Sequence, residues 1–217
     1  MIIRVLVADD HAIIREGLCI MLGNQPDMEV VGSAANGREA VELVEKHKPD
    51  VIVIDISMPE LNGIDAIQQM LPLHPHMQVV VLSIHETKPY VYRALKAGAK
   101  GYLLKETAGL EVVDAVRAVH RSERYLSQRI SDVLMDAAFL HLEASIDFSL
   151  LETLSPRERE ILQLVAEGKT SQEIGKRLFI SPKSVDTYRS RLMHKIGVED
   201  MAGLIKFAIQ QGLISLE

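Results

Sequence analysis

The chain has 217 residues, 47% of them hydrophobic and 25% charged, which is the composition of an ordinary globular protein of one or two domains. Its 24 Lys and Arg residues against 30 Asp and Glu residues give a net charge of −6, which taken over the whole chain argues against nucleic-acid binding. Cys19 is the only cysteine, so a disulfide framework and a cysteine-based zinc site are excluded. No apolar run reaches the roughly 18 residues of a membrane span, and we expect a cytoplasmic protein with no membrane partner.

Short β-branched runs alternate with longer amphipathic runs over residues 1–121. The predicted strands are Ile2–Ala8, Val30–Ala34, Val51–Ile54, Gln78–Leu82 and Gly101–Leu104. The predicted helices are Ala12–Leu22, Gly37–Lys46, Ile64–Leu71, Pro89–Ala97 and Ala108–His120. In the first of these helices, one stripe holds Ile13, Ile14, Leu18, Met21 and Leu22. The alternation predicts an α/β domain, a doubly wound five-stranded parallel sheet with helices on both faces.

Residues 122–150 have a different pattern. The spacing of apolar residues from Leu126 to Ala138 favours one helix, but serines and an acidic excess surround it. We interpret this stretch as a linker with a helix in it. A sixth helix of the first domain describes the pattern nearly as well.

From Leu151 onward the sequence carries only helix signals, and four short helices predict a small all-α domain over residues 151–217. Ser155 and Thr170 are each followed three residues later by a glutamate, the pattern of a capping box. A third helix starts at Ser181, and its predicted inner face holds Val185, Tyr188, Leu192 and Ile196. The last helix is apolar nearly all round, so one side should pack on the domain and the other could form a dimer seam.

Polar residues follow four of the predicted strands. The first strand ends at Asp9 and Asp10, the third at Asp55, the fourth at Ser83 and the fifth at Lys105. Ligands of open α/β sheets bind beyond the carboxyl ends of the strands, and a strand order of 2-1-3-4-5 would bring the three carboxylates together. A cation such as Mg²⁺ would relieve their repulsion. Each residue alone has an ordinary structural explanation, but their joint placement favours phosphoryl transfer onto Asp55.

These residues, with the runs 54–63 and 101–105, resemble the receiver domains of bacterial two-component response regulators over residues 1–121. The resemblance implies a flavodoxin-like fold in which Asp55 accepts a phosphoryl group from a sensor histidine kinase. It also implies that Mg²⁺ is bound by Asp10, Asp55 and the main-chain carbonyl of Ser57, with Asp9 assisting from one layer further out.

The same resemblance implies a switch. Lys105 would pair with the phosphoryl group, Ser83 would swing toward it, and Tyr102 would turn inward behind Ser83. One residue departs from the pattern, because Glu106 stands where many receivers have proline.

Charge is divided unevenly along the chain. Residues 1–121 carry a net charge of −4 and residues 122–150 carry −3, whereas residues 169–195 hold seven basic residues against two acidic ones. A basic stretch on a helix-turn-helix is typical of DNA binding, and the third helix of this domain is the candidate reader of a major groove. The candidate DNA contacts are Ser171, Gln172, Lys183, Ser184, Thr187, Ser190, Arg191 and Lys195. The alternative is a solvated helix face, which Asp186 favours locally because its carboxylate would repel phosphate.

The runs 154–158 and 180–185 and the pair Glu173-Ile174 resemble the LuxR-type DNA-binding domain of NarL/FixJ response regulators over residues 151–215. Departures at Ser171-Gln172, Gly175 and Tyr188 leave the preferred DNA sequence open. The two resemblances together imply a DNA-binding response regulator, not an enzyme, that forms homodimers on paired DNA half-sites when phosphorylated. RNA polymerase is a further candidate partner.

Two other functions compete with this one. An aspartate-nucleophile phosphatase would need a second acid to turn over the acyl phosphate, and Ser57 stands two residues after Asp55, where that acid would be expected. A constitutive DNA binder would not need to retain every part of the acidic site. If the acidic part covers the basic helix until Asp55 is phosphorylated, the fragment 151–217 should bind DNA more tightly than the unphosphorylated chain.

Overall fold

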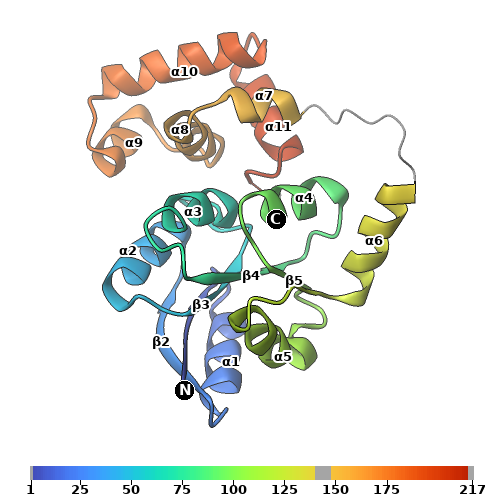
Figure 1. Ribbon diagram of the computed structural model, residues 1–217. Coiled ribbons are helices and arrows are strands. Elements are labelled where there is room, and N and C mark those ends of the chain that lie inside the picture. Colours follow the sequence, from blue (N-terminus) through green and yellow to red (C-terminus); the bar gives the residue numbers. More distant parts are fainter. Residues whose placement is uncertain (1, 140–147, 215–217) are drawn as a thin grey trace. The chain divides into compact units, whose positions relative to one another are not determined.

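The short β-branched runs of the first part of the chain pair into one six-stranded parallel sheet of order β2-β1-β3-β4-β5-β6 (Figure 1). The computed structural model describes residues 2–139 and 148–214. The strands are β1 (Ile3–Ala8), β2 (Met28–Ala34), β3 (Val51–Asp55), β4 (Gln78–Ser83), β5 (Gly101–Leu104) and β6 (Tyr125–Leu126). The doubly wound parallel fold and the 2-1-3-4-5 order are confirmed, and β6 is an additional edge strand that the sequence did not predict.

Helices cover both faces of this sheet. One face packs against α1 (Ala12–Gly23) and α5 (Ala108–His120). The other face packs against α2 (Gly37–His47), α3 (Gly63–Met70), α4 (Lys88–Lys96) and α6 (Gln128–Phe139). Successive strand residues point to opposite faces, so Ile52 joins one core and Val53 the other. This is why the central strands β3 and β4 are apolar along nearly their whole length.

The segment after α5 belongs to the first compact unit, which spans Met1–Glu143. Ile130 of α6 is fully buried, and Leu126 and Leu134 pack against the same core. The structure therefore differs from the interpretation of residues 122–150 as a linker, and the alternative of a sixth helix describes residues 128–139. Residues 140–147 of that stretch lie outside the described residues, and residues 148–150 begin α7 (Phe148–Thr153) of the second unit.

The second compact unit, Ala144–Glu217, is helical. Its helices are α7 (Phe148–Thr153), α8 (Pro156–Ala166), α9 (Ser171–Leu178), α10 (Pro182–Ile196) and α11 (Met201–Gln210). Both predicted capping boxes form, at Ser155 and at Thr170, while α7 was not predicted. Val185, Leu192 and Ile196 of α10 are buried in the core of this unit. None of the helices in the described ranges is long and apolar enough to cross a membrane.

Candidate functional site

An acidic cluster lies at the carboxyl ends of β1 and β3. The two strands are neighbours, and Ala8 lies opposite Ile54, so the residues that follow, Asp9 and Asp55, sit side by side. Asp9, Asp10, His11 and Asp55 each offer a ligand atom, and these atoms all lie within 4.8 Å of one another. Asp9 and Asp55 are buried, while Asp10 is partly exposed. The predicted convergence of three carboxylates is therefore present in the structure.

Lys105 neutralises part of this charge. Its Nζ lies 2.8 Å from Oδ2 of Asp55 and 2.8 Å from Oδ2 of Asp9. Burial raises the pKa of the Asp55 carboxyl, and the Lys105 ammonium opposes that shift. Burial also works to lower the pKa of Lys105, but the two carboxylates outweigh it and the net shift is upward. The end of β5 thus places a fixed positive charge against the predicted phosphoacceptor.

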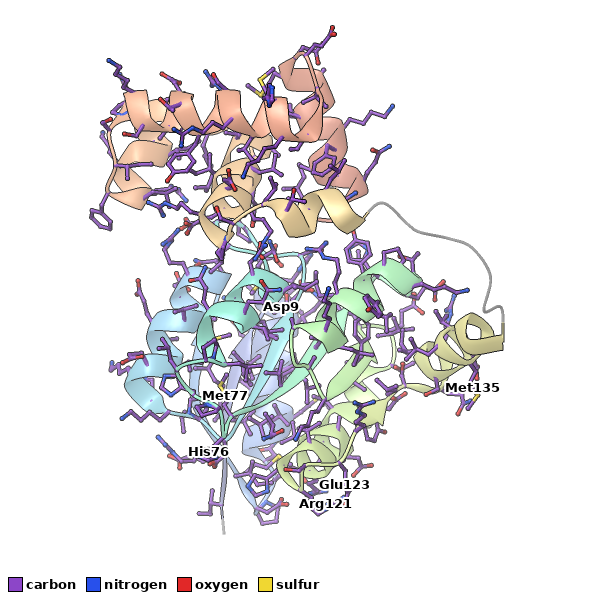
Figure 2. The ribbon with its side chains drawn as sticks, turned by 45° about the horizontal axis from the view of Figure 1, so that its top comes forward. Asp9, His76, Met77, Arg121, Glu123 and Met135 are labelled. Atoms are coloured by element: carbon purple, nitrogen blue, oxygen red, sulfur yellow. The ribbon has the colours of Figure 1, made fainter. Side chains whose placement is uncertain are left out.

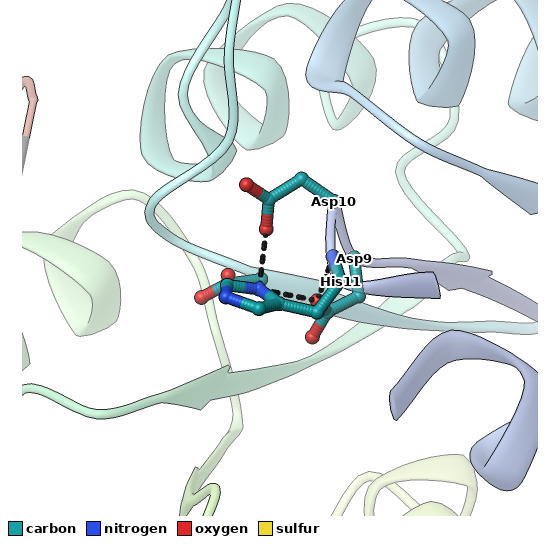
Figure 3. A group of neighbouring side chains, drawn as sticks. Asp9, Asp10 and His11 are labelled. Atoms are coloured by element: carbon teal, nitrogen blue, oxygen red, sulfur yellow. Dashed lines mark hydrogen bonds and ion pairs between the residues drawn. The ribbon is translucent and has the colours of Figure 1, made fainter. Parts of the chain in front are cut away.

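His11 is a member of the cluster that the sequence analysis missed. Its Nδ1 lies 2.8 Å from Oδ1 of Asp10 and 3.3 Å from Oδ1 of Asp9, as Figure 3 shows. The same nitrogen is 3.4 Å from Nζ of Lys105. His11 directly follows the aspartate pair in the sequence, and that adjacency was the available signal.

The loop after β3 holds Asp55 against the start of α3. The amide of Gly63 donates to the carbonyl oxygen of Ile56 at 2.8 Å. A Cβ atom added at Gly63 would lie 2.0 Å from the carbonyl oxygen of Asp55, so no larger residue fits there without a shift of the backbone. Within the same loop, the Ser57 amide donates to Oδ1 of Asp55 at 3.3 Å.

His85 connects Ser83 and Tyr102. Its amide donates to Oγ of Ser83 at 3.0 Å, and its carbonyl oxygen accepts from the Tyr102 hydroxyl at 2.7 Å. Its ring stacks on Tyr90 with 3.9 Å between centroids, and its Nε2 lies 3.0 Å from Oγ of Ser57. Burial lowers the pKa of the imidazole, and the Lys105 charge lowers it further. Sequence reasoning did not select His85, although it stands two residues after Ser83.

Tyr102 is fully buried and already lies inside the domain. Burial raises the pKa of its hydroxyl far above the ordinary value, so it acts as a neutral donor. Ser83 is buried as well, at the end of the neighbouring strand β4. The two predicted switch residues are thus brought together through the backbone of His85.

The donor set of the acidic cluster suits a hard divalent cation. Three carboxylates from Asp9, Asp10 and Asp55 converge, and carboxylate oxygens are the protein ligands that Mg²⁺ and similar ions prefer. Two of the three are buried, where water cannot screen their repulsion. The residues present therefore fit such an ion.

The predicted DNA-reading helix is α10, and its outward face is exposed at Lys183, Thr187, Ser190 and Arg191. Gln172, in the first turn of α9, is exposed too. With Lys195, six of the eight predicted contacts thus present side chains to solvent. They come from two adjacent helices, as in a helix-turn-helix.

Three of the predicted DNA contacts have side-chain partners within their own unit. The Ser171 hydroxyl donates to Oδ1 of Asp186 at 2.6 Å, and the Ser184 hydroxyl lies 2.8 Å from that of Ser181. Lys195 donates to both carboxylate oxygens of Glu158, at 2.7 and 2.9 Å. Sequence spacing does not reveal these intramolecular partners, and the contact of these three residues with DNA stays a prediction.

Two known families match the two units. Residues 5–117 match the response regulator receiver domain, and residues 152–208 match the bacterial regulatory proteins of the luxR family. The chain is 34% identical to the oxygen regulatory protein NreC of Staphylococcus haemolyticus over 215 residues, which covers 97% of this chain and 99% of that protein. The chain belongs to the NarL/FixJ family of response regulators. This regulator is also 35% identical to the transcriptional regulatory protein DegU of Brevibacillus brevis, over 99% of this chain and 96% of that protein.

A solved structure agrees with this assignment. The complex of the two-component response regulator RcsB with DNA aligns with a TM-score of 0.60 and 26% identity, over 97% of this chain and 99% of that one. The regulator is therefore a DNA-binding response regulator with a receiver domain and a LuxR-type helix-turn-helix domain. Its family is one of transcription regulators and not of enzymes.

Proposed function

We propose that Asp55 is the phosphoacceptor of this regulator and that its phosphorylation controls DNA binding. The observation that carries the proposal is the buried Asp55 carboxylate, which has Lys105 at 2.8 Å on one side and the Asp9 and Asp10 carboxylates on the other. A nucleophile, a fixed cation and a cation-binding group of carboxylates are the parts that phosphoryl transfer to an aspartate requires.

In the proposed reaction the donor is the phosphohistidine of a sensor kinase. A carboxylate oxygen of Asp55 attacks the phosphorus, the new O–P bond forms an acyl phosphate, and the P–N bond breaks. The imidazole leaves and takes a proton from water. Lys105 is close enough to exchange its bond with Asp55 for one with a phosphoryl oxygen, and the Ser83 hydroxyl retains a proton that it can donate there.

The proposed cofactor is Mg²⁺, held by Asp10, Asp55 and the main-chain carbonyl of Ser57, with Asp9 one layer behind. When bound, the ion would neutralise charge on the phosphoryl oxygens. The role of the protein is to keep the carboxylates in place, which the Lys105 bonds to Asp9 and Asp55 do.

For the second unit we propose that α10 enters a major groove, with Ser171 and Gln172 of α9 nearby. The α10 contacts would be Lys183, Ser184, Thr187, Ser190, Arg191 and Lys195. Phosphorylated chains would pair on two DNA half-sites. The seam would be the side of α11 that the domain core leaves partly exposed, at Ile205 and Ile209. RNA polymerase is the candidate partner of the DNA-bound dimer.

The mass of the intact protein tests the first step. We expect incubation with acetyl phosphate and Mg²⁺ to add one phosphoryl group to the wild type and none to Asp55→Asn. As a control, Asp27→Asn alters an aspartate of the same domain that pairs with Arg117 and should leave the labelling intact. No added mass on the wild type, or equal labelling of Asp55→Asn, would contradict the proposal.

A phosphatase that uses Asp55 as its nucleophile is the competing enzyme function. Ser57, which stands where the second acid would be needed, places its hydroxyl against Nε2 of His85. Multiple turnover of small phosphate esters by the purified protein would favour the phosphatase. Equal DNA affinity of the Asp55→Ala variant and the phosphorylated wild type would instead favour a constitutive DNA binder.

A further inference from the structure

The segment after α5 is joined to the candidate phosphorylation site at three places. The first is the backbone, because Leu126 of β6 lies opposite Tyr102 of β5. The amide of Ser127 then donates to the carbonyl oxygen of Tyr102 at 3.0 Å. Tyr102 also reaches the loop after Ser83 through its hydroxyl, so this residue links the site directly to the start of the segment.

The second place is a two-bond ion pair. Nε of Arg129 lies 2.5 Å from Oε2 of Glu86, and its Nη2 donates to Oε1 of Glu86 at 2.9 Å. Glu86 stands three residues after Ser83, in the loop between β4 and α4. The next residue along α6, Ile130, is fully buried in the core. The backbone of Arg129 is thus fixed to the domain while its guanidinium holds the loop.

The third place is Glu106, the residue that departs from the proline found in many receivers. Its Oε2 lies 3.8 Å from Nη1 of Arg129, and it directly follows Lys105. The peptide bond between them is trans, since no peptide bond in the described residues is cis. Ser83, Glu86, Lys105, Glu106 and Arg129 all line one cavity of about 120 Å³.

We propose that Arg129 is a positioning residue that couples the phosphorylation site to α6. This inference rests on the proposed phosphorylation of Asp55. Ser83 and Lys105 are the groups that would move toward the phosphoryl group, and the loops that follow them carry Glu86 and Glu106. Because Arg129 bonds to Glu86 and lies 3.8 Å from Glu106, a movement of either loop changes the contacts that join these loops to α6. The chain runs from α6 through residues 140–147 into the DNA-binding unit, so α6 is the element through which the signal would leave the receiver.

The expected effect is modest because the ion pair is partly exposed. The Arg129 and Glu86 side chains are 60% and 40% exposed, and pairs of this kind change an equilibrium about two- to fivefold. The two-bond geometry and the buried neighbour Ile130 place Arg129 at the upper end of that range. We therefore expect a graded loss of coupling rather than a complete one.

The experiment measures how much phosphorylation tightens DNA binding by the full chain. Wild type and Arg129→Ala are treated with acetyl phosphate and Mg²⁺, the phosphorylated fraction is read from the intact mass, and the DNA dissociation constant is measured on the same samples. We expect Arg129→Ala to bind DNA like the wild type before phosphorylation. Its gain in affinity per phosphorylated chain should be about two- to fivefold smaller.

A charge exchange separates coupling from simple stabilisation. The double variant Arg129→Glu with Glu86→Arg should recover part of the gain that Arg129→Glu alone loses, because it restores the Glu86 pair but not the approach to Glu106. The matched control is Arg121→Ala, which breaks a similarly exposed two-bond pair with Glu123 in the same domain (Figure 2) and should keep the full gain.

Two results would overturn the inference. The first is a fully phosphorylated Arg129→Ala whose DNA affinity rises as much as that of the wild type. The second is an equal loss of this rise in Arg121→Ala. Either result would overturn this inference but leave the proposed function standing. Absence of phosphate on wild-type Asp55 would overturn the proposed function, and this inference with it, so the two failures are distinguishable in one set of samples.

Discussion

At the scale of single residues, the site depends on how closely two backbone segments approach. Gly63 touches the carbonyl oxygen of Asp55 so closely that a Cβ atom there would lie at 2.0 Å. Gly17, on α1, is the opposite case, because an added Cβ would meet nothing within 4 Å. The close approach therefore requires glycine at position 63, whereas the space around position 17 admits a larger residue.

We predict that Gly63→Ala destabilises the receiver by about 1–3 kcal/mol, because the loop must shift away from Asp55. The same shift should slow labelling of Asp55 by acetyl phosphate. The control Gly17→Ala should stabilise the domain by up to about 1 kcal/mol, the usual gain from removing a glycine inside a helix. Urea unfolding of both variants measures this difference, and equal effects would contradict the close-approach argument.

Site residues at strand ends could be predicted from the sequence, whereas long-range side-chain pairs could not. Asp9, Asp10, Asp55, Ser83 and Lys105 could be selected because strand ends converge by rule in a parallel sheet. Arg129 could not, because its partner Glu86 lies 43 positions away and no local pattern connects them. His11 directly follows two aspartates, and this position alone indicates that its side chain lies near the site.

At the scale of elements, an ion pair between Glu158 and Lys195 joins α8 to α10. Lys195 is one of the residues that the sequence indicated as a DNA contact. Glu158 is buried at the start of α8, where it closes the capping box with Ser155 and also binds Lys195. Burial works to raise the pKa of Glu158, but the bonds from Lys195 and Ser155 outweigh it and hold the pKa below its ordinary 4.5. Lys195 therefore stabilises the helical unit, and its contact with DNA stays a prediction.

We predict that Lys195→Ala lowers the free energy of unfolding of the fragment 144–217 by about 1–3 kcal/mol at pH 7, because a buried carboxylate loses a partner. The exposed Lys183→Ala should stay within about 0.5 kcal/mol of the wild type.

The pH dependence follows from the sign of the Glu158 shift. A carboxylate with a lowered folded-state pKa stabilises the fold above its unfolded-state pKa and loses that contribution as the pH falls through the folded-state value. Stability of the wild-type fragment should therefore drop below about pH 4.5, the ordinary value. The drop should be smaller in Lys195→Ala. Glu173, whose pKa Thr170 lowers, contributes equally to both proteins. Parallel pH profiles would contradict this assignment.

Helices and strands could be predicted where the residues that determine them are close together in the sequence. The capping boxes at Ser155 and Thr170 form as the sequence indicated, because a cap is built within four residues. The two-residue strand β6 could not be predicted, since it exists only through its pairing with β5. Ile13 fell on the predicted stripe of α1 but is 87% exposed, because the buried face is narrower and centres on Leu18 and Leu22.

At the scale of the whole molecule, acidic and basic residues are concentrated in different parts of the chain. Residues 1–150 carry 14 Lys and Arg residues against 21 Asp and Glu residues, while the stretch 169–195 is basic. We predict that the acidic part, which is tethered to the basic one, weakens the attraction of the unphosphorylated chain to DNA phosphate. The net charge of −6 therefore does not argue against DNA binding.

We predict that the fragment 144–217, which has its own hydrophobic core, binds DNA more tightly than the unphosphorylated full chain. Its affinity should also fall more steeply with salt, because more of its basic residues displace counterions. Fluorescence anisotropy with labelled duplex DNA at several salt concentrations measures both quantities. Equal affinities at low salt would show that the acidic part has no such effect.

The central claim is that phosphorylation of Asp55 controls DNA binding, and one measurement tests it most directly. The dissociation constant of the full chain for a duplex with paired half-sites, selected from random DNA, is measured with and without acetyl phosphate and Mg²⁺. The account predicts tighter binding by the phosphorylated wild type and no change for Asp55→Asn under the same conditions. A labelled wild type whose affinity does not change, or an Asp55→Asn variant that responds equally, would contradict it.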